Sequence, residues 1–169
     1  GDHQTEAMVP IGASSREQAE IMYRQAVGFI DRTPGLKERF RTYDGYRRVY
    51  CHRTNGRIQI YAADDRTGDG IIPTLPLLEE LHRHRDFRLY RTWRGKLDKR
   101  QGTLAAISTA GEPGSEFEDI RLKHRATATD VTRDGGHVRA AGGGMVLHDW
   151  AVPDPETVED MDAVKALYP

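Results

Sequence analysis

Two adjacent carboxylates at the end of an apolar run have the spacing in this sequence best suited to catalysis. Residues 75–78 read Leu-Pro-Leu-Leu, and Glu79 and Glu80 follow directly. In an open parallel sheet, ligands bind beyond the carboxyl ends of the strands. In ATP hydrolysis the first acid of such a pair supports a magnesium ion through its waters, and the second polarises the attacking water. The alternative, equal on spacing alone, is that both acids begin a helix, where the helix dipole favours negative charge.

A second strand end presents two hydroxyl groups. Residues 103–107 predict the most clearly buried strand of the chain, and Ser108 and Thr109 follow it. Hydroxyls at such a position are suited to sensing the terminal phosphate of a nucleotide.

The elements around these residues predict an α/β fold with a mainly parallel sheet. Residues 7–11 predict a short buried strand, and Ser14 with Glu17 predicts a capping box at the start of a helix that ends at Pro34-Gly35. This strand–turn–helix order is the unit from which parallel α/β sheets are built. The buried stripe of the helix is expected at Ala19, Met22, Ala26, Phe29 and Ile30.

Further along, Asn55-Gly56 predicts a partly exposed β-hairpin between residues 47–52 and 57–63, inserted outside the main sheet. The remaining predicted elements are a strand at 72–78, a basic helical stretch to residue 100, a helix at 117–126, a glycine-rich region, a strand at 145–150 and a short helix within 155–167.

Charge is distributed unevenly although the net charge is −1. Eight Lys and Arg residues between positions 83 and 100 stand against two acids, whereas residues 154–162 hold five acids and no base. A solvated helix face is the first interpretation of the basic block, and a phosphate-contacting surface is the second. In the second case the DNA-contacting side chains would be Arg83, Arg85, Arg88, Arg94, Lys96 and Arg100.

Other chemistry-bearing residues receive plainer interpretations. His82, His84 and Asp86 would share one side only on a strand, and this stretch favours a helix, so we expect no zinc site there. The single cysteine, Cys51, is expected to be a hairpin side chain in a reducing compartment. No apolar run approaches the roughly 18 residues of a membrane helix, so no membrane partner is expected.

Several segments, in this order, resemble the ATPase domain of the terminase large subunit, the DNA-packaging motor of tailed bacteriophages. Residues 13–19 (ASSREQA) resemble the strand-to-helix segment after the P-loop helix, and residues 62–70 (AADDRTGDG) resemble the loop before the Walker B strand. Residues 77–82 (LLEELH) resemble Walker B, residues 106–111 (AISTAG) the coupling motif, and residues 147–151 (LHDWA) the return strand near the domain end.

The resemblance implies roles for individual residues. Glu80 would be the catalytic glutamate, and Glu79 the magnesium-side acid, where the family usually has Asp. Ser108 and Thr109 would couple the phosphate state to motion, and Arg66 lies in the loop where some members place an arginine finger.

The phosphate-binding Walker A motif, G-x-x-x-x-G-K-[ST], is absent, because the only Gly-Lys pair is Gly95-Lys96 with Leu97 after it. We therefore interpret the chain as a truncated P-loop NTPase-like fragment of the ASCE type. Residues 1–150 would be a partial ATPase core, and residues 151–169 an acidic linker toward a nuclease domain. The parent would use ATP and Mg²⁺, and this piece alone is expected to bind neither well nor to cut DNA.

For the parent, the resemblance implies partners in the bacterial host cytoplasm: double-stranded viral DNA, the portal and the small terminase subunit. Loss of a central strand would expose a sheet edge, so we expect a homodimer or swapped arrangement of the fragment. The alternative function is a non-catalytic prophage remnant or a module that binds DNA or a partner through the 83–100 surface. A stand-alone hydrolase is the third.

Overall fold

The computed structural model describes residues 6–62, 70–151 and 161–165. The chain forms two compact units, Gly1–Gly111 and Glu112–Pro169. This boundary does not coincide with the division at residue 150 expected from the sequence, and the extent of the ATPase core stays a prediction.

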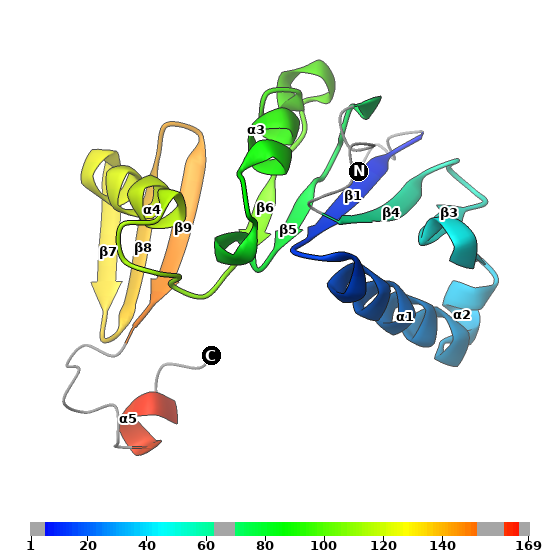
Figure 1. Cartoon of the computed structure of the whole chain (residues 1–169), viewed down its shortest axis with the longest axis horizontal. Helices are drawn as coiled ribbons and strands as arrows, with labels where there is room; N and C mark the ends of the chain where they lie inside the picture. Colours follow the sequence, from blue (N-terminus) through cyan, green and yellow to red (C-terminus); the bar gives the residue numbers. More distant parts are fainter. Residues whose placement is uncertain (1–5, 63–69, 152–160, 166–169) are drawn as a thin grey trace. The chain divides into compact units, whose positions relative to one another are not determined.

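The first unit is built on a six-stranded sheet with the order β2-β3-β4-β1-β5-β6 (Figure 1). Strands β4, β1, β5 and β6 are mutually parallel, and β2 and β3 extend the sheet in antiparallel fashion. The predicted α/β fold with a mainly parallel sheet is confirmed. The strand bounds are β1 Met8–Ala13, β2 Phe40–Tyr43, β3 Arg48–Cys51, β4 Arg57–Ala62, β5 Leu77–Glu79 and β6 Ala105–Ile107.

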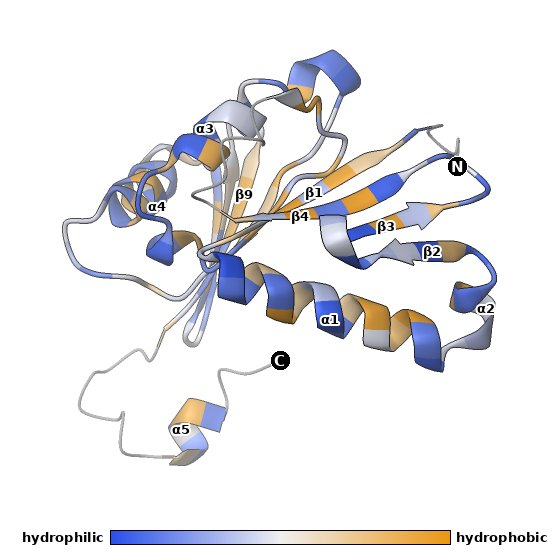
Figure 2. Ribbon diagram, turned by 45° about the vertical axis from the view of Figure 1, so that its right-hand side comes forward, coloured by the Kyte–Doolittle hydropathy of each residue, from blue (hydrophilic) through white to orange (hydrophobic). Residues whose placement is uncertain are grey.

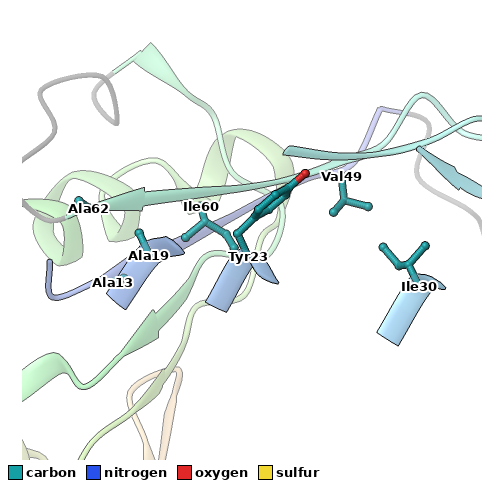
Figure 3. Close-up of a cluster of buried hydrophobic side chains, with 7 residues drawn as sticks. All are labelled: Ala13, Ala19, Tyr23, Ile30, Val49, Ile60 and Ala62. Carbon is teal, nitrogen blue, oxygen red and sulfur yellow. The ribbon is translucent and has the colours of Figure 1, made fainter. Parts of the chain in front are cut away.

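Helix α1 (Arg16–Arg32) covers one face of this sheet. It begins one residue later than predicted, because Ser15 is the N-cap and its hydroxyl accepts the backbone N–H of Gln18. Its buried side is Ala19, Tyr23 and Ile30, which pack against β1, β3 and β4 (Figure 3). Phe29, expected in the buried stripe, is 72% exposed because it lies about 100° around the helix from Ile30. A short helix, α2 (Pro34–Lys37), follows.

The opposite face of β1 and β5 is covered by α3 (Arg88–Arg94), so the unit has three layers (Figure 2). The buried side chains of Trp93 and Leu89 converge with that of Leu78 of β5 above Gly12 of β1. Gly12 of β1 makes this close approach feasible, since a Cβ at that position would lie 2.6 Å from Leu78 Cδ2. The basic stretch is therefore not one helix but the 3₁₀ turn η3 (Leu81–Arg83), α3 and the 3₁₀ turn η4 (Leu97–Arg100).

The predicted hairpin forms, but it is not an insertion outside the sheet. Strands β3 and β4 pair in antiparallel fashion around Asn55, and β4 also pairs in parallel along the whole of β1. The hairpin belongs to the main sheet because Ile58, Ile60 and Ala62 alternate onto the α1 side and help form the core. Strand β2 was not predicted from the sequence, and the 3₁₀ turn η1 (Asp44–Tyr46) connects it to β3.

Strand β6 is more exposed than the sequence predicts. The sequence predicts that residues 103–107 are well buried, yet Ala105, Ala106 and Ile107 are all exposed, Ile107 by 75%. The reason is position, since β6 is an edge strand that pairs only with β5 among the described strands. The predicted strand at 72–78 is shortened to Leu77–Glu79, because Pro73 and Pro76 cannot donate ladder hydrogen bonds.

The second unit is a three-stranded antiparallel sheet, β7 (Asp130–Asp134), β8 (His137–Gly142) and β9 (Met145–Trp150), packed against α4 (Glu116–Thr127). Strand β9 and helix α4 agree with the sequence, whereas the sequence predicts no strand where β7 and β8 form. The glycine pairs 135–136 and 143–144 are hairpin turns, in which Gly135, Gly143 and Gly144 have positive φ. The short helix α5 (Met161–Lys165) lies in the acidic tail. No helix in the described ranges is long and apolar enough to cross a bilayer.

Candidate functional site

The carboxyl ends of β1, β5 and β6 lie side by side in the first unit, and polar side chains gather there. Glu79 pairs with Ile107 in the β5–β6 register, so the residues following both strands become neighbours. Helix α1, which follows β1, contributes a side chain from its first turn. We call this group the acid–hydroxyl cluster, and its members are Gln18, Glu79, Glu80, His82, Ser108 and Thr109.

Glu79 is the partly buried acid of the cluster. Its Oε1 accepts a hydrogen bond of 3.4 Å from the side-chain amide of Gln18. Its Oε2 is buried without a hydrogen-bond partner among the described residues. Burial raises the pKa of Glu79 above its usual value, and the neighbouring Glu80 carboxylate raises it further. A buried carboxylate oxygen that lacks a donor is an arrangement that a cation would stabilise.

Glu80 is held in a strained backbone conformation. Its φ of 49° and ψ of 50° lie in the left-handed region, which residues with a Cβ rarely occupy. The turn ends the strand and brings Glu80 Oε2 to 3.5 Å from His82 Nε2. The two acids therefore do not begin an α-helix, since Glu79 ends β5 and Glu80 precedes a single 3₁₀ turn.

His82 joins the acids to the hydroxyls. Its backbone N–H donates to Ser108 Oγ at 3.0 Å, and its Nδ1 lies 2.9 Å from the same oxygen. Thr109 Oγ1 lies 3.2 Å from the ring at Nε2. If the Ser108 hydroxyl donates to Nδ1, the ring proton resides on Nε2 and faces Glu80. Sequence reasoning weighed His82 as a zinc ligand and assigned it no role beside the two acids. Its placement could have been found from the parallel pairing of β5 and β6.

His84 contacts the cluster through the backbone of Glu79. It is buried, and its Nε2–H donates to the backbone carbonyl of Glu79 at 3.0 Å. Burial lowers the pKa of His84, because the protonated ring would have to give up its hydration. Asp86 accepts the backbone N–H of Arg88, so the three residues of the His-x-His-x-Asp pattern have three different neighbours. Gln18 is the other cluster member that the sequence did not single out; its only signal is its place three residues after the N-cap of α1.

The remaining predicted residues do not gather at this cluster. Arg66 lies outside the described residues. Arg94 places its guanidinium 5.9 Å from the ring centre of Tyr90, and Arg100 donates to the carbonyl of Glu6 at 2.8 Å. The rest of the predicted DNA-contacting set divides into the exposed Arg83 and Arg85 and the half-buried Arg88 and Lys96. The six residues are spread over two 3₁₀ turns, a helix and their connections.

The cluster has the chemistry of a magnesium site rather than of a zinc site. Two carboxylates and two hydroxyls are hard oxygen donors, which Mg²⁺ prefers, often through bound waters. Glu79 Oε2 is the oxygen with most need of a cation. A base, Glu80, stands beside it with a histidine that can fix its orientation. Within the described ranges no three His, Cys, Asp or Glu side chains converge to hold a metal ion directly, so a divalent cation here would bind through its waters, and Glu80 is placed to accept a proton from one of them.

The sequence of residues 3–123 matches the family model described as the terminase large subunit, ATPase domain. The chain belongs to the terminase large subunit ATPase family. The match includes Glu79, Glu80, Ser108 and Thr109 and ends within α4. The family predicted from the short motifs is therefore confirmed.

Solved terminases share the fold. The HK97 bacteriophage large terminase has a TM-score of 0.63 at 19% identity, covering 73% of this chain and 26% of that chain. The Thermus phage P74-26 large terminase ATPase domain has a TM-score of 0.60 at 16% identity, covering 98% of this chain and 72% of that chain. This chain thus spans about a quarter of the HK97 terminase in length. No curated protein matches it in sequence. The P-loop NTPase-like fold expected for a terminase ATPase is confirmed by these similarities.

Proposed function

We propose that this chain carries the water-activating and magnesium-side acids of a terminase large subunit, the ATP-driven motor that moves viral DNA into the procapsid. The observation that carries the proposal is the convergence of Glu79, Glu80 and Ser108 at one edge of a parallel sheet in a chain of this family. Strand ends are where open α/β sheets bind their ligands.

Each side chain has a defined task in the proposal. Glu79 would hold the magnesium ion, whose positive charge would offset the burial that raises the pKa of this carboxyl. Glu80 orients the attacking water and accepts its proton, and His82 holds the Glu80 carboxylate. Mg²⁺ supplies charge neutralisation at the phosphates when it is bound.

The phosphate-binding loop comes from upstream polypeptide in this proposal. The chain lacks the Walker A motif, so its own affinity for ATP is expected to be low. The exposed edge of β6 offers unpaired backbone groups to an added parallel strand. Without that strand, the same edge would favour pairing with a second copy, which light scattering would detect as a dimer.

Further roles of the parent extend beyond this chain. We propose that a nuclease domain, the portal and the small terminase subunit act with the full-length protein in the host cytoplasm. Arg66, which follows β4 in the sequence, remains the candidate arginine finger, and a Glu in place of Asp at position 79 alters the reach of the magnesium-side acid.

The test is ATP binding with Mg²⁺ by calorimetry, comparing this chain with one extended upstream through the predicted P-loop. Only the extended chain should bind, and Glu80→Gln should abolish its turnover while leaving binding intact. Glu118→Gln, an acid on α4 that caps its own helix turn, is the matched control and should keep full turnover. Tight nucleotide binding by this chain alone would contradict the proposed division. If neither chain binds, the non-catalytic module is the better account.

A further inference from the structure

The side of β2, β3 and β4 opposite α1 carries a surface that the proposed chemistry does not use. Because strand residues alternate, Phe40, Val49 and Ile60 on the α1 side leave their sequence neighbours on the other side. We call this surface the Arg–Tyr face, and its members are Arg41, Tyr43, Tyr46, Arg48, Tyr50 and Arg57. Helix α3 covers β1 and β5 (Figure 2), and its Trp93 contacts Tyr61 of β4. Among the described residues, Arg41, Tyr43, Tyr46 and Arg57 are exposed.

The charge of this segment differs from that of the whole chain. The protein has 25 basic and 26 acidic residues in total. Residues 39–62 hold six arginines, no lysine and a single acid, Asp44. That acid accepts the hydroxyl of Tyr23 from α1 at 2.9 Å. Strands β2, β3 and β4 themselves contain no acid at all, so a positive surface results that is made of arginine alone.

Arginine and tyrosine alternate across the strands in a fixed pattern. Arg41, Tyr50 and Arg57 form one row across the sheet, and Tyr43, Arg48 and Gln59 form the next. Arg41 and Arg57 are therefore separated by two strand spacings, about 10 Å. Tyr43, Tyr46, Arg48 and Tyr50 line a hollow of about 290 Å³.

Contacts within the surface fix the guanidinium groups in place. Arg41 lies 5.7 Å from the ring centre of Tyr43, and Arg48 lies 5.4 Å from that of Tyr46. Arg48 also donates to Gln59 Oε1 at 2.9 Å and 3.1 Å. Preorganised arginines lose less conformational entropy when they bind, and their planar donors match the oxygens of a phosphate.

From this arrangement we infer that the Arg–Tyr face binds the phosphodiester backbone of duplex DNA. The choice of DNA among possible polyanions rests on the proposed function. The mode of contact is inferred from the surface itself. Tyr43 and Tyr46 have guanidinium groups over their rings, so these rings are engaged and are not open platforms for unpaired bases. Guanidinium and phenol groups on a flat sheet instead suit phosphates, which position a duplex without reading its sequence.

The Arg–Tyr face is a better candidate than the 83–100 surface predicted from the sequence. There, Arg94 covers Tyr90, Arg100 binds a backbone carbonyl, and Asp86 and Asp98 interrupt the positive charge. On the Arg–Tyr face the arginines occupy adjacent strands of one rigid sheet, with no acid between them.

The test measures binding of this 169-residue chain to a short fluorescent duplex of mixed sequence by anisotropy, over about 50 to 200 mM salt. The unsubstituted chain is compared with a triple variant that combines Arg41→Ala, Arg48→Ala and Arg57→Ala. The affinity of the variant for the duplex should fall by roughly tenfold or more. The slope of log affinity against log salt concentration should decrease by about one for each phosphate contact that is lost. The matched control combines Arg83→Ala, Arg85→Ala and Arg94→Ala, which removes equal charge and should change affinity less than about threefold.

A second variant separates lost contacts from lost folding. Arg41→Lys, Arg48→Lys and Arg57→Lys together keep the charge but remove the paired donors, so affinity should fall by a smaller factor while the salt dependence persists. Circular dichroism and the melting temperature of each variant report its folding.

Four outcomes would overturn the inference. The first two are no duplex binding by the unsubstituted chain, and a loss of affinity in the control variant equal to or larger than that in the triple variant. The other two are tighter binding of single strands than of duplex, and displacement of the duplex by an acidic peptide as effectively as by unlabelled duplex. Glu80→Gln should leave this binding unchanged, so a failure here and a failure of the proposed ATPase role are distinguishable.

Discussion

The parallel and antiparallel parts of the six-stranded sheet carry opposite kinds of chemistry. Strands β1, β5 and β6 run in the same direction, and their carboxyl ends bring acids, hydroxyls and a histidine into one partly buried cluster. Strand β4, which also pairs in parallel with β1, forms with β2 and β3 the antiparallel part, whose open side presents arginines and tyrosines in rows. One region is organised at the ends of its strands, and the other across their faces.

This difference follows from strand geometry. In parallel strands every chain leaves the sheet at the same edge, so the residues that follow the strands meet whatever their distance in sequence. In antiparallel strands the ends alternate, and the alternation of side chains produces an extended surface instead. We conclude that the acid–hydroxyl cluster is suited to one small ligand, whereas the Arg–Tyr face is suited to a long, charged one.

The largest effect is expected where a helix covers the sheet. Trp93→Ala should lower the free energy of unfolding by about 3–5 kcal/mol, because a fully buried aromatic side chain is replaced by a cavity. Urea denaturation followed by circular dichroism measures this loss. Phe29→Ala is the control, since that side chain is 72% exposed, and it should change stability by less than about 0.5 kcal/mol. Similar losses for both variants would contradict the three-layer packing.

A smaller effect tests whether the cluster acts as a unit. In the chain extended through the P-loop, His82→Ala should lower kcat by about tenfold with little change in KM, because Glu80 loses its orienting contact. His82→Asn retains an amide near Ser108 and should recover part of the rate. Turnover measured over a range of ATP concentrations separates the two constants. A change confined to KM would show that His82 serves binding rather than orientation.

The smallest effect is expected in the pH dependence of stability that comes from His84, next to the acid–hydroxyl cluster. Burial lowers the pKa of His84, so its contribution to stability is present above the usual histidine pKa of about 6.5 and is lost as pH falls through the lowered pKa. His84→Gln keeps a donor for the Glu79 carbonyl but takes up no proton. The melting temperature of the His84→Gln variant should therefore fall less than that of the unsubstituted chain between about pH 7 and pH 5. Parallel curves for the two proteins would refute this assignment.

Sequence reasoning found the acids and hydroxyls of the cluster but not how they are connected. Glu79, Glu80, Ser108 and Thr109 were recognisable because each pair directly follows an apolar run. His82 and Gln18 carry no such local signal. They become cluster members only because β5 pairs with β6 and the Gln18 side chain in the first turn of α1 reaches Glu79. Their roles in turnover stay predictions until they are measured.

The errors in the sequence-based fold have a common cause. Residues 103–107 have the composition of a buried strand, yet β6 is an exposed edge, because burial depends on which strands and helices lie beside it. Phe29 was expected in the buried stripe of α1 but is 72% exposed, and Tyr23, which the predicted stripe did not include, is buried, since a small error in helix phase rotates the stripe. The glycine-rich region was expected to be irregular, although its glycines are hairpin turns between β7, β8 and β9.

The sequence by itself determined the α/β class, the family and the positions of the two acids, because apolar periodicity, turn residues and short motifs are local properties of the chain. Only the tertiary structure decided that His82 bridges Glu80 to Ser108 and that three arginines share one side of the sheet. Those facts depend on strand order and register, which arise from packing between residues far apart in the sequence.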